Sequence, residues 1–194
     1  MGSREAEADR VVYNCLLAGD LEGAAEAAGS RLGRVAAAEL NRLAVSLARQ
    51  EAARRAAGEI RESLRLARRR RALLVFKDHG LDVDRLLPAV RLAPGYSGKI
   101  ILAAVSGGAA DGRVCLRGGD DWHREILADL RDEVVDAGLS RSQVDELGGA
   151  RLRLEADGRL FVFGGSEEFG ACDKEYAAEI IKKKFRDRMI KIRD

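Results

Sequence analysis

The stretch KIILAAVSGGAADGRVCLRG, residues 99–118, decides the fold of the second half of the chain. It contains an apolar run, KIILAAV, and a shorter run, RVCLRG, separated by a glycine-rich segment from Gly107 to Gly112. Runs of this length and composition, bounded by turn residues, predict a buried strand, a turn and a second strand. The second half of the chain is therefore expected to contain a β-sheet.

A helix is predicted directly after these two strands. Asp120 and Asp121 are residues of the kind that cap helix N-termini, and a terminating glycine follows at Gly138. The apolar residues between them recur with the period of a helix that buries one face: Trp122, Ile126, Leu127, Leu130, Val134 and Val135. Trp122 is expected to lie in the core or to pack as an apolar staple at the start of the helix.

Further elements complete this half of the chain. The runs ARLRLEA and RLFVFGG flank Asp157 and Gly158, which is a strong signal for a β-hairpin. A helix is predicted over about 173–185, and a short strand, RMIKI, over 188–192. The order β, β, α, β, β, α, β predicts an α+β fold, with helices packed on a mixed sheet, for a domain at 90–194.

The first half of the chain has a helical composition. From Arg4 to about Lys77 it is rich in Ala, Leu, Arg and Glu and contains no proline, which predicts an all-helical region at 1–85. Two breaks are indicated, so that two short helices precede a long one. The residues that indicate them are Gly19 with Asp20, and then Gly29, Ser30 and Gly33.

The long helix is predicted to run from about Val35 into the 70s. Its apolar stripe loses register between Leu47 and Ile60, so one bent helix and two separate helices both fit the pattern. A single long helix would extend beyond a small domain and would indicate packing against a second copy or a partner, which predicts a homo-oligomer. A compact antiparallel helical bundle is the alternative.

A run of four arginines lies within this long helix, at Arg68, Arg69, Arg70 and Arg71. The whole chain has 34 basic and 32 acidic residues, and this near balance is not typical of a nucleic-acid-binding protein. Because arginine pairs with phosphate through two parallel hydrogen bonds, the run is a candidate contact for nucleic acid or an acidic partner. A solvated helix face is the alternative, since no aromatic residue alternates with these arginines to stack bases.

The cysteine content and the lack of long apolar runs predict a cytoplasmic protein. The three cysteines are widely spaced, and no pair has the spacing of a zinc or redox motif. No stretch approaches the roughly 20 apolar residues of a membrane span, so no membrane association is predicted. In GSEEFGAC, Ala171 and Cys172 stand where a nucleotide-binding loop needs Lys and Ser or Thr. No cofactor or metal is predicted.

From about Gly95 to Ile192 the chain resembles the small protein-histidine phosphatases of the Janus/Ocnus family. The motifs that carry the resemblance are, in order, a strand that bears Lys99, then DWHREI, LGGAR and FVFGGSEEFG. The resemblance implies a protein-histidine-phosphatase-like α+β fold. It also implies hydrolysis, without a metal, of a phosphohistidine or a related phosphate. The implied partner is a phosphorylated protein or a small phosphate substrate.

The resemblance further implies the roles of individual residues. His123 corresponds to the catalytic histidine, which acts as general base on the attacking water. The phosphate is held by two cations and by the loop before the last helix: Lys99, Arg151, Ser166 and the backbone of Glu168, Phe169 and Gly170. These residue types suit the reaction, because phosphoryl transfer needs positioned positive charge, backbone donors and a group that takes a proton.

Two features leave another function open. Glu167 and Glu168 stand where the family carries small and aromatic residues, and their charge would oppose a phosphate if either side chain turned inward. The helical first half also lies outside the resemblance. The alternative is therefore a non-enzymatic binding module for nucleic acid or a protein, with the helical region mediating assembly. In that case His123 is an exposed first-turn residue, Lys99 and Arg151 are edge-strand charges, and Ser166 is a turn residue.

Overall fold

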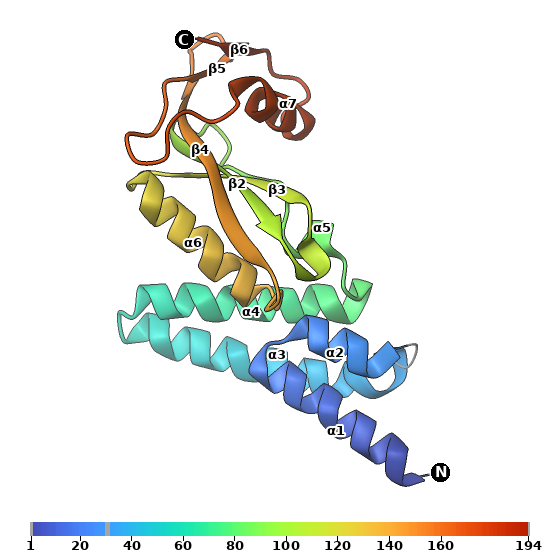
Figure 1. Cartoon of the computed structure of the whole chain (residues 1–194). Helices are drawn as coiled ribbons and strands as arrows, with labels where there is room; N and C mark the ends of the chain where they lie inside the picture. The colour runs from blue at the N-terminus through green and yellow to red at the C-terminus, as the bar shows by residue number, and fades with distance from the viewer. Residues whose placement is uncertain (1, 30–31, 194) are drawn as a thin grey trace. The chain divides into compact units, whose positions relative to one another are not determined.

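The computed structural model describes residues 2–29 and 32–193 (Figure 1). The α-helices are α1 (Gly2–Ala18), α2 (Leu21–Ala28), α3 (Leu32–Ala56), α4 (Ile60–His79), α5 (Val83–Leu86), α6 (His123–Asp136) and α7 (Lys174–Lys184). The strands are β1 (Val90–Arg91), β2 (Gly98–Ser106), β3 (Arg113–Gly119), β4 (Gln143–Leu154), β5 (Leu160–Phe163) and β6 (Ile190–Ile192). Helices come first and a mixed sheet follows, which confirms the predicted α+β class.

The chain divides into two compact units that are interleaved in sequence. The helical unit holds the residues up to Leu87 together with Asp132–Ser142. The sheet unit holds Pro88–Arg131 together with the residues from Gln143 onward. The division falls inside α6, so the first residues of this helix belong to the sheet unit and its last residues to the helical unit.

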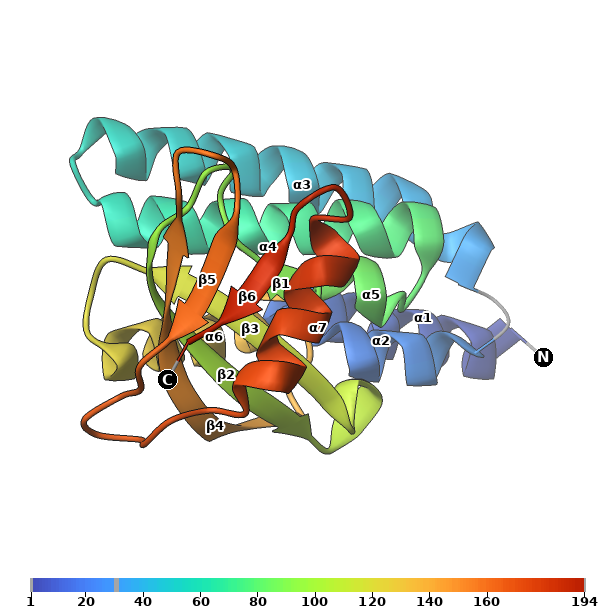
Figure 2. The same cartoon turned by 90° about the horizontal axis from the view of Figure 1, so that it is seen from above.

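Gly58 separates α3 from α4, so the helix predicted from Val35 into the 70s forms as two helices. Gly58 has a φ of +77°, which glycine adopts easily, and the N–H of Glu59 donates to the carbonyl oxygen of Arg54 at 2.9 Å. α3 and α4 lie side by side and antiparallel (Figures 1 and 2). The single long helix on which the prediction of a homo-oligomer rested is thus replaced by an antiparallel pair, and the oligomer itself stays a prediction.

The two predicted breaks near the N-terminus differ in outcome. α1 ends before Gly19, and the Asp20 carboxylate caps α2 by accepting from the N–H of Gly23 at 2.9 Å, as predicted. α2 then ends at Gly29, while Ser30 lies outside the described residues and Gly33 lies within α3. None of the described helices combines the length and the apolar character that a membrane span requires.

The sheet unit is built on a six-stranded sheet in the order β1-β3-β2-β4-β5-β6. β2 is antiparallel to both β3 and β4, and β4 is antiparallel to β5, whereas β1 and β6 pair in parallel with β3 and β5. The strands predicted on either side of the glycine-rich turn and of Asp157 and Gly158 all form. β4 begins at Gln143, well before the predicted start at Ala150, and β1 was not predicted.

α7 covers one face of this sheet (Figure 2). Its buried positions, Ala177, Ile180 and Ile181, recur at helical spacing. They share a core with buried apolar residues of the sheet and the segments beside it: Val90, Leu92, Ile100, Leu102, Leu116, Ala150, Leu152, Leu160, Val162 and Cys172. Because successive residues of a strand point to opposite faces, Lys99 and Arg151 stand on the face away from α7.

Candidate functional site

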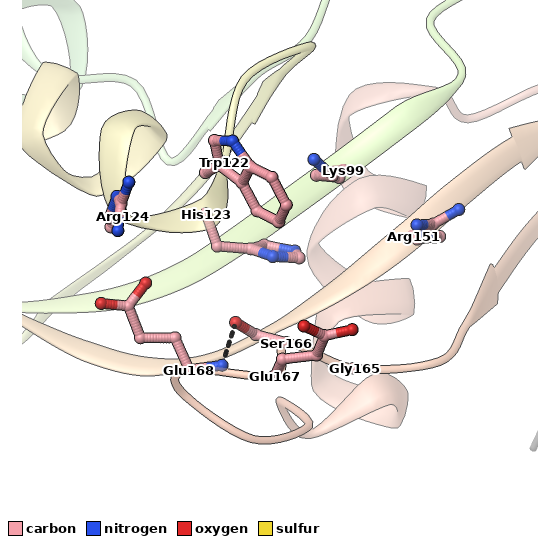
Figure 3. A pocket seen from close by; sticks show the side chains of 9 residues that line it. All are labelled: Lys99, Trp122, His123, Arg124, Arg151, Gly165, Ser166, Glu167 and Glu168. Carbon is pink, nitrogen blue, oxygen red and sulfur yellow. Dashed lines mark hydrogen bonds between the residues drawn. The ribbon is translucent and has the colours of Figure 1, made fainter.

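A cavity of about 360 Å³ opens on this other face of the sheet unit (Figure 3). It is formed by the β2 and β4 strands, the start of α6 and the loop after β5. Its lining residues are Lys99, Trp122, His123, Arg124, Arg151, Gly165, Ser166, Glu167 and Glu168. Five of the seven predicted catalytic and phosphate-binding residues therefore come together: Lys99, His123, Arg151, Ser166 and Glu168. Phe169 and Gly170 are not among the lining residues.

Sheet register places the two predicted cations side by side. Lys99 on β2 is the antiparallel partner of Arg151 on β4, and paired residues project from the same face of a sheet. Among residues 2–29 and 32–193, no carboxylate forms an ion pair with either side chain. Both positive charges are thus available to an anion in the cavity.

His123 lies at the wall of this cavity and is 8% exposed. Its Nε2 atom is 3.2 Å from the carbonyl oxygen of Ala150. A carbonyl oxygen can only accept, so Nε2 carries the proton in this hydrogen bond. In the neutral imidazole, Nδ1 is then the nitrogen that can accept a proton. The alternative in which His123 is an exposed first-turn residue does not fit this burial.

Gly149 on β4 makes room for the histidine. A Cβ atom at this position would lie 2.6 Å from Cδ2 of His123 and 2.9 Å from Cβ of Ser166. Both distances are shorter than carbon atoms tolerate, so only glycine lets the imidazole and the serine approach the strand together. The second glycine of LGGAR is therefore part of the construction of the site.

The loop between β5 and α7 is fixed against β4 by backbone hydrogen bonds. The N–H of Gly149 and the N–H of Ser166 both donate to the carbonyl oxygen of Gly170, each at 3.0 Å. The N–H of Cys172 donates in turn to the carbonyl oxygen of Gly149 at 3.0 Å. These bonds hold Ser166 beside His123 without any side chain of the loop taking part.

The Ser166 hydroxyl is oriented by its own loop. Its Oγ atom accepts from the N–H of Glu168 at 3.3 Å and from the N–H of Phe169 at 3.2 Å (Figure 3). These two N–H groups, predicted to face a phosphate, are thus bonded to the serine. Because Oγ already accepts two hydrogen bonds, the hydroxyl proton is left to donate, and such chains of hydrogen bonds strengthen one another.

Trp122 lies at the mouth of the cavity and not in the core, which was one of its two predicted placements. The residue is 60% exposed, and the Nζ atom of Lys99 lies 4.6 Å from the centre of its ring, within the range of a cation–π interaction. Arg124, the residue directly after His123, also lines the cavity and was not predicted as a site residue. The only available signal was that both residues flank His123 at a helix start.

Tyr96 is a further residue that sequence reasoning missed. Its hydroxyl lies 2.6 Å from the carbonyl oxygen of Lys99 and 2.9 Å from that of Gly119, so the O–H is shared between the ends of β2 and β3. Burial raises the pKa of this phenol above its ordinary value of 10.0. Tyr96 therefore fixes the backbone from which Lys99 projects.

The acidic residues of the loop face the same cavity as the cations. Glu167 and Glu168 both line it, and both are exposed. Figure 3 shows the Glu168 side chain extending toward the side of Arg124, while the Glu167 carboxylate lies on the other side of Ser166. In the described part of the chain, no group of three or more His, Cys, Asp or Glu side chains is arranged to hold a metal ion.

The four arginines of α4 do not form one free cationic face. The Nε atom of Arg68 lies 3.0 Å from the carboxylate of Asp136, which is almost fully buried. The Nε atom of Arg70 lies 3.2 Å from the carboxylate of Glu51 on α3. Two of the four charges predicted to bind nucleic acid or an acidic partner thus pair within the helical unit.

A family model matches the part of the chain that holds the cavity. The model describes the Janus/Ocnus family (Ocnus), and the match covers residues 85–189, which is more than half of the chain. None of the curated proteins compared with the chain matches it. The match names a family and no reaction.

Proposed function

We propose, from the premise that this chain belongs to the Janus/Ocnus family, that its cavity hydrolyses a phosphohistidine or a related phosphate substrate. The observation that carries the proposal is the meeting of a buried histidine with two unpaired cations in one cavity. Phosphoryl transfer depends chiefly on fixed positive charge around the phosphoryl oxygens and on a positioned proton acceptor. The cavity supplies both.

The binding of the phosphoryl group falls to three side chains. Lys99 and Arg151 project from paired positions of β2 and β4 and provide the positive charge. The Ser166 hydroxyl donates a hydrogen bond, because its oxygen already accepts from two N–H groups of the loop. A guanidinium is well suited to two phosphoryl oxygens, since it presents parallel N–H donors.

The proton transfer falls to His123. With Nε2–H donated to Ala150, Nδ1 accepts a proton from the attacking water as its oxygen bonds to phosphorus. The bond between phosphorus and the leaving nitrogen or oxygen breaks, its electron pair goes to the leaving atom, and that atom takes up a proton from solvent while His123 returns the water's proton to solvent. Inorganic phosphate and the free side chain are the products.

A phosphate-release assay tests this proposal. The substrates are a peptide that carries phosphohistidine and an aryl phosphate. His123→Asn keeps a donor for the Ala150 carbonyl but has no basic nitrogen, so we expect the rate to fall by about 100-fold or more. His79→Ala is the matched control, because His79 is exposed at the end of α4 and is the only other histidine of the chain. Equal rates for wild type and His123→Asn would remove His123 from the reaction.

A further inference from the structure

We infer that Glu167 and Glu168 select substrates with a positive charge next to the phosphoryl group, namely peptides with lysine or arginine beside the phosphorylated residue. The inference rests on the proposed function and extends it to the class of substrate. It assigns a role to the feature of the cavity that phosphate binding alone does not use.

The two carboxylates lie beside the proposed phosphate-binding groups. Both glutamates belong to the loop that also positions Ser166, and both line the cavity that holds Lys99 and Arg151. Their side chains diverge from the loop on either side of the serine (Figure 3). A phosphoryl group held by the serine and the two cations would therefore have a carboxylate on each flank.

Neither carboxylate is engaged by a cation of the cavity. Within residues 2–29 and 32–193, neither glutamate forms an ion pair with Lys99, Arg124 or Arg151, although all five side chains line one cavity. Both glutamates are also exposed, so a ligand can reach them. The cavity thus presents unpaired charges of both signs.

A cavity with charges of both signs disfavours a purely anionic ligand. A free phosphate or a strongly acidic phosphopeptide would gain from the cations and lose by repulsion from the two glutamates. A ligand with an anionic group and an adjacent cation satisfies both sets of charges at once. Electrostatic complementarity of this kind acts mainly on the choice between partners.

Trp122 adds a surface that suits the same ligand. Its ring is largely exposed at the mouth of the cavity, and it already attracts the ammonium group of Lys99 at 4.6 Å. An indole ring attracts a lysine or arginine side chain of a peptide through the same interaction. We expect a basic residue next to the phosphorylated side chain to contact this ring.

The test compares phosphohistidine peptides that differ only in the residues on either side of the histidine, which are Lys, Ala or Glu. Wild type, Glu167→Gln/Glu168→Gln and the control Glu179→Gln are compared by kcat/KM for phosphate release. Glu179 is exposed on α7, pairs with Lys183 and does not line the cavity. Peptide binding is followed separately in a His123→Asn background by the fluorescence of Trp122, the single tryptophan of the chain.

We expect wild type and Glu179→Gln to prefer the Lys peptide over the Ala peptide by roughly 3- to 10-fold, and over the Glu peptide by more. The double variant should lose this preference. Equal kcat/KM for the three peptides in wild type, or a preference that survives in the double variant, would overturn the inference and leave the proposed hydrolysis standing. A glutamate-dependent preference in binding without hydrolysis would support the inference and overturn the reaction. The absence of both binding and hydrolysis would overturn the inference and the proposed function together.

Discussion

The Nε2 atom of His123 lies 3.2 Å from the carbonyl oxygen of Ala150, the residue that precedes Arg151 on β4. One strand therefore fixes both the proposed base and one of the two proposed phosphate-binding cations. The histidine comes from α6, and its approach to β4 depends on the absence of a side chain at Gly149.

Gly149→Ala should reduce the rate of phosphate release far more than its loss of folding free energy would explain. The new Cβ would displace His123 and Ser166, and overpacking of this kind costs about 1–3 kcal/mol. Gly112→Ala is the control, since Gly112 lies in open space with a φ of +73° and its substitution costs roughly 1–2 kcal/mol through the backbone alone. Urea denaturation and the phosphate-release rate are measured on both variants. If both variants lost activity in proportion to their loss of stability, Gly149 would have no special role in the site.

Arg151→Ala should weaken the binding of inorganic phosphate at least about 5-fold, because a charge-assisted contact to the anion is lost. Phosphate is titrated into the protein and followed by Trp122 fluorescence. Arg153→Ala is the matched control on the same strand, where Arg153 pairs with Glu155 and lies outside the cavity. An unchanged affinity in Arg151→Ala would exclude this guanidinium from the anion site.

Removal of divalent metal ions should leave the rate of phosphate release unchanged. The positive charge that the reaction needs is assigned to side chains, Lys99 and Arg151, which a chelator does not remove. The rate is measured before and after dialysis against a chelator, with a known metal-dependent phosphatase treated in parallel. A loss of activity that added metal restores would contradict this assignment.

Arg68→Ala should destabilise the protein by roughly 1–3 kcal/mol. It removes the nearer of two arginines from the buried carboxylate of Asp136 and leaves Arg65 at 3.6 Å as the remaining partner. Arg71 is exposed on the same helix, so Arg71→Ala should be nearly neutral. The free energies of unfolding are compared by urea denaturation. Similar values for the two variants would show that the ion pair contributes little.

The pH dependence of stability should carry a signature of Asp136. Burial raises the pKa of this carboxyl above its ordinary value of 3.8, although Arg68 and Arg65 act in the opposite direction. The folded state then holds the proton more tightly than the unfolded state. The resulting stability is complete below 3.8 and is lost as the pH rises through the raised pKa.

Wild type should therefore lose stability relative to Asp136→Asn as the pH rises above this ordinary value, and the difference should level off once the carboxyl is ionised in both states. Urea denaturation of the two proteins from about pH 3 to about pH 7 measures this difference. A difference that moved in favour of wild type with rising pH would mean that the arginines outweigh burial.

Local patterns in the sequence predicted most of the sheet unit. The strands on either side of Gly107 to Gly112 and the hairpin at Asp157 and Gly158 were predicted correctly. Each is signalled by residues that lie close together in the sequence. β1 could not be predicted in the same way, since its two residues are a strand only through pairing with β3. The early part of β4 was missed because Gly148 and Gly149 interrupt its pattern, and a bulge opposite Leu102 and Ala103 shifts its register.

The candidate site was predicted in its residue types and not in its geometry. The side-by-side placement of Lys99 and Arg151 follows from strand register, which no local pattern encodes. Trp122 fits the apolar period of α6 and was expected in the core or as an apolar staple at the start of the helix. In the structure it lies at the mouth of the cavity against the ammonium group of Lys99, a partner from another strand that the helical pattern could not reveal.

The interleaving of the two units limits how this protein can be shortened. Leu139 is fully buried within the helical unit, and the carbonyl oxygen of Gly138 accepts from the N–H groups of Leu21 and Glu22. A recombinant fragment that starts at Pro88 would carry residues 132–142 without these partners and would expose apolar surface there. Truncation at Pro88 therefore does not separate the two units cleanly, and a fragment limited to the sheet unit would need a redesigned end of α6.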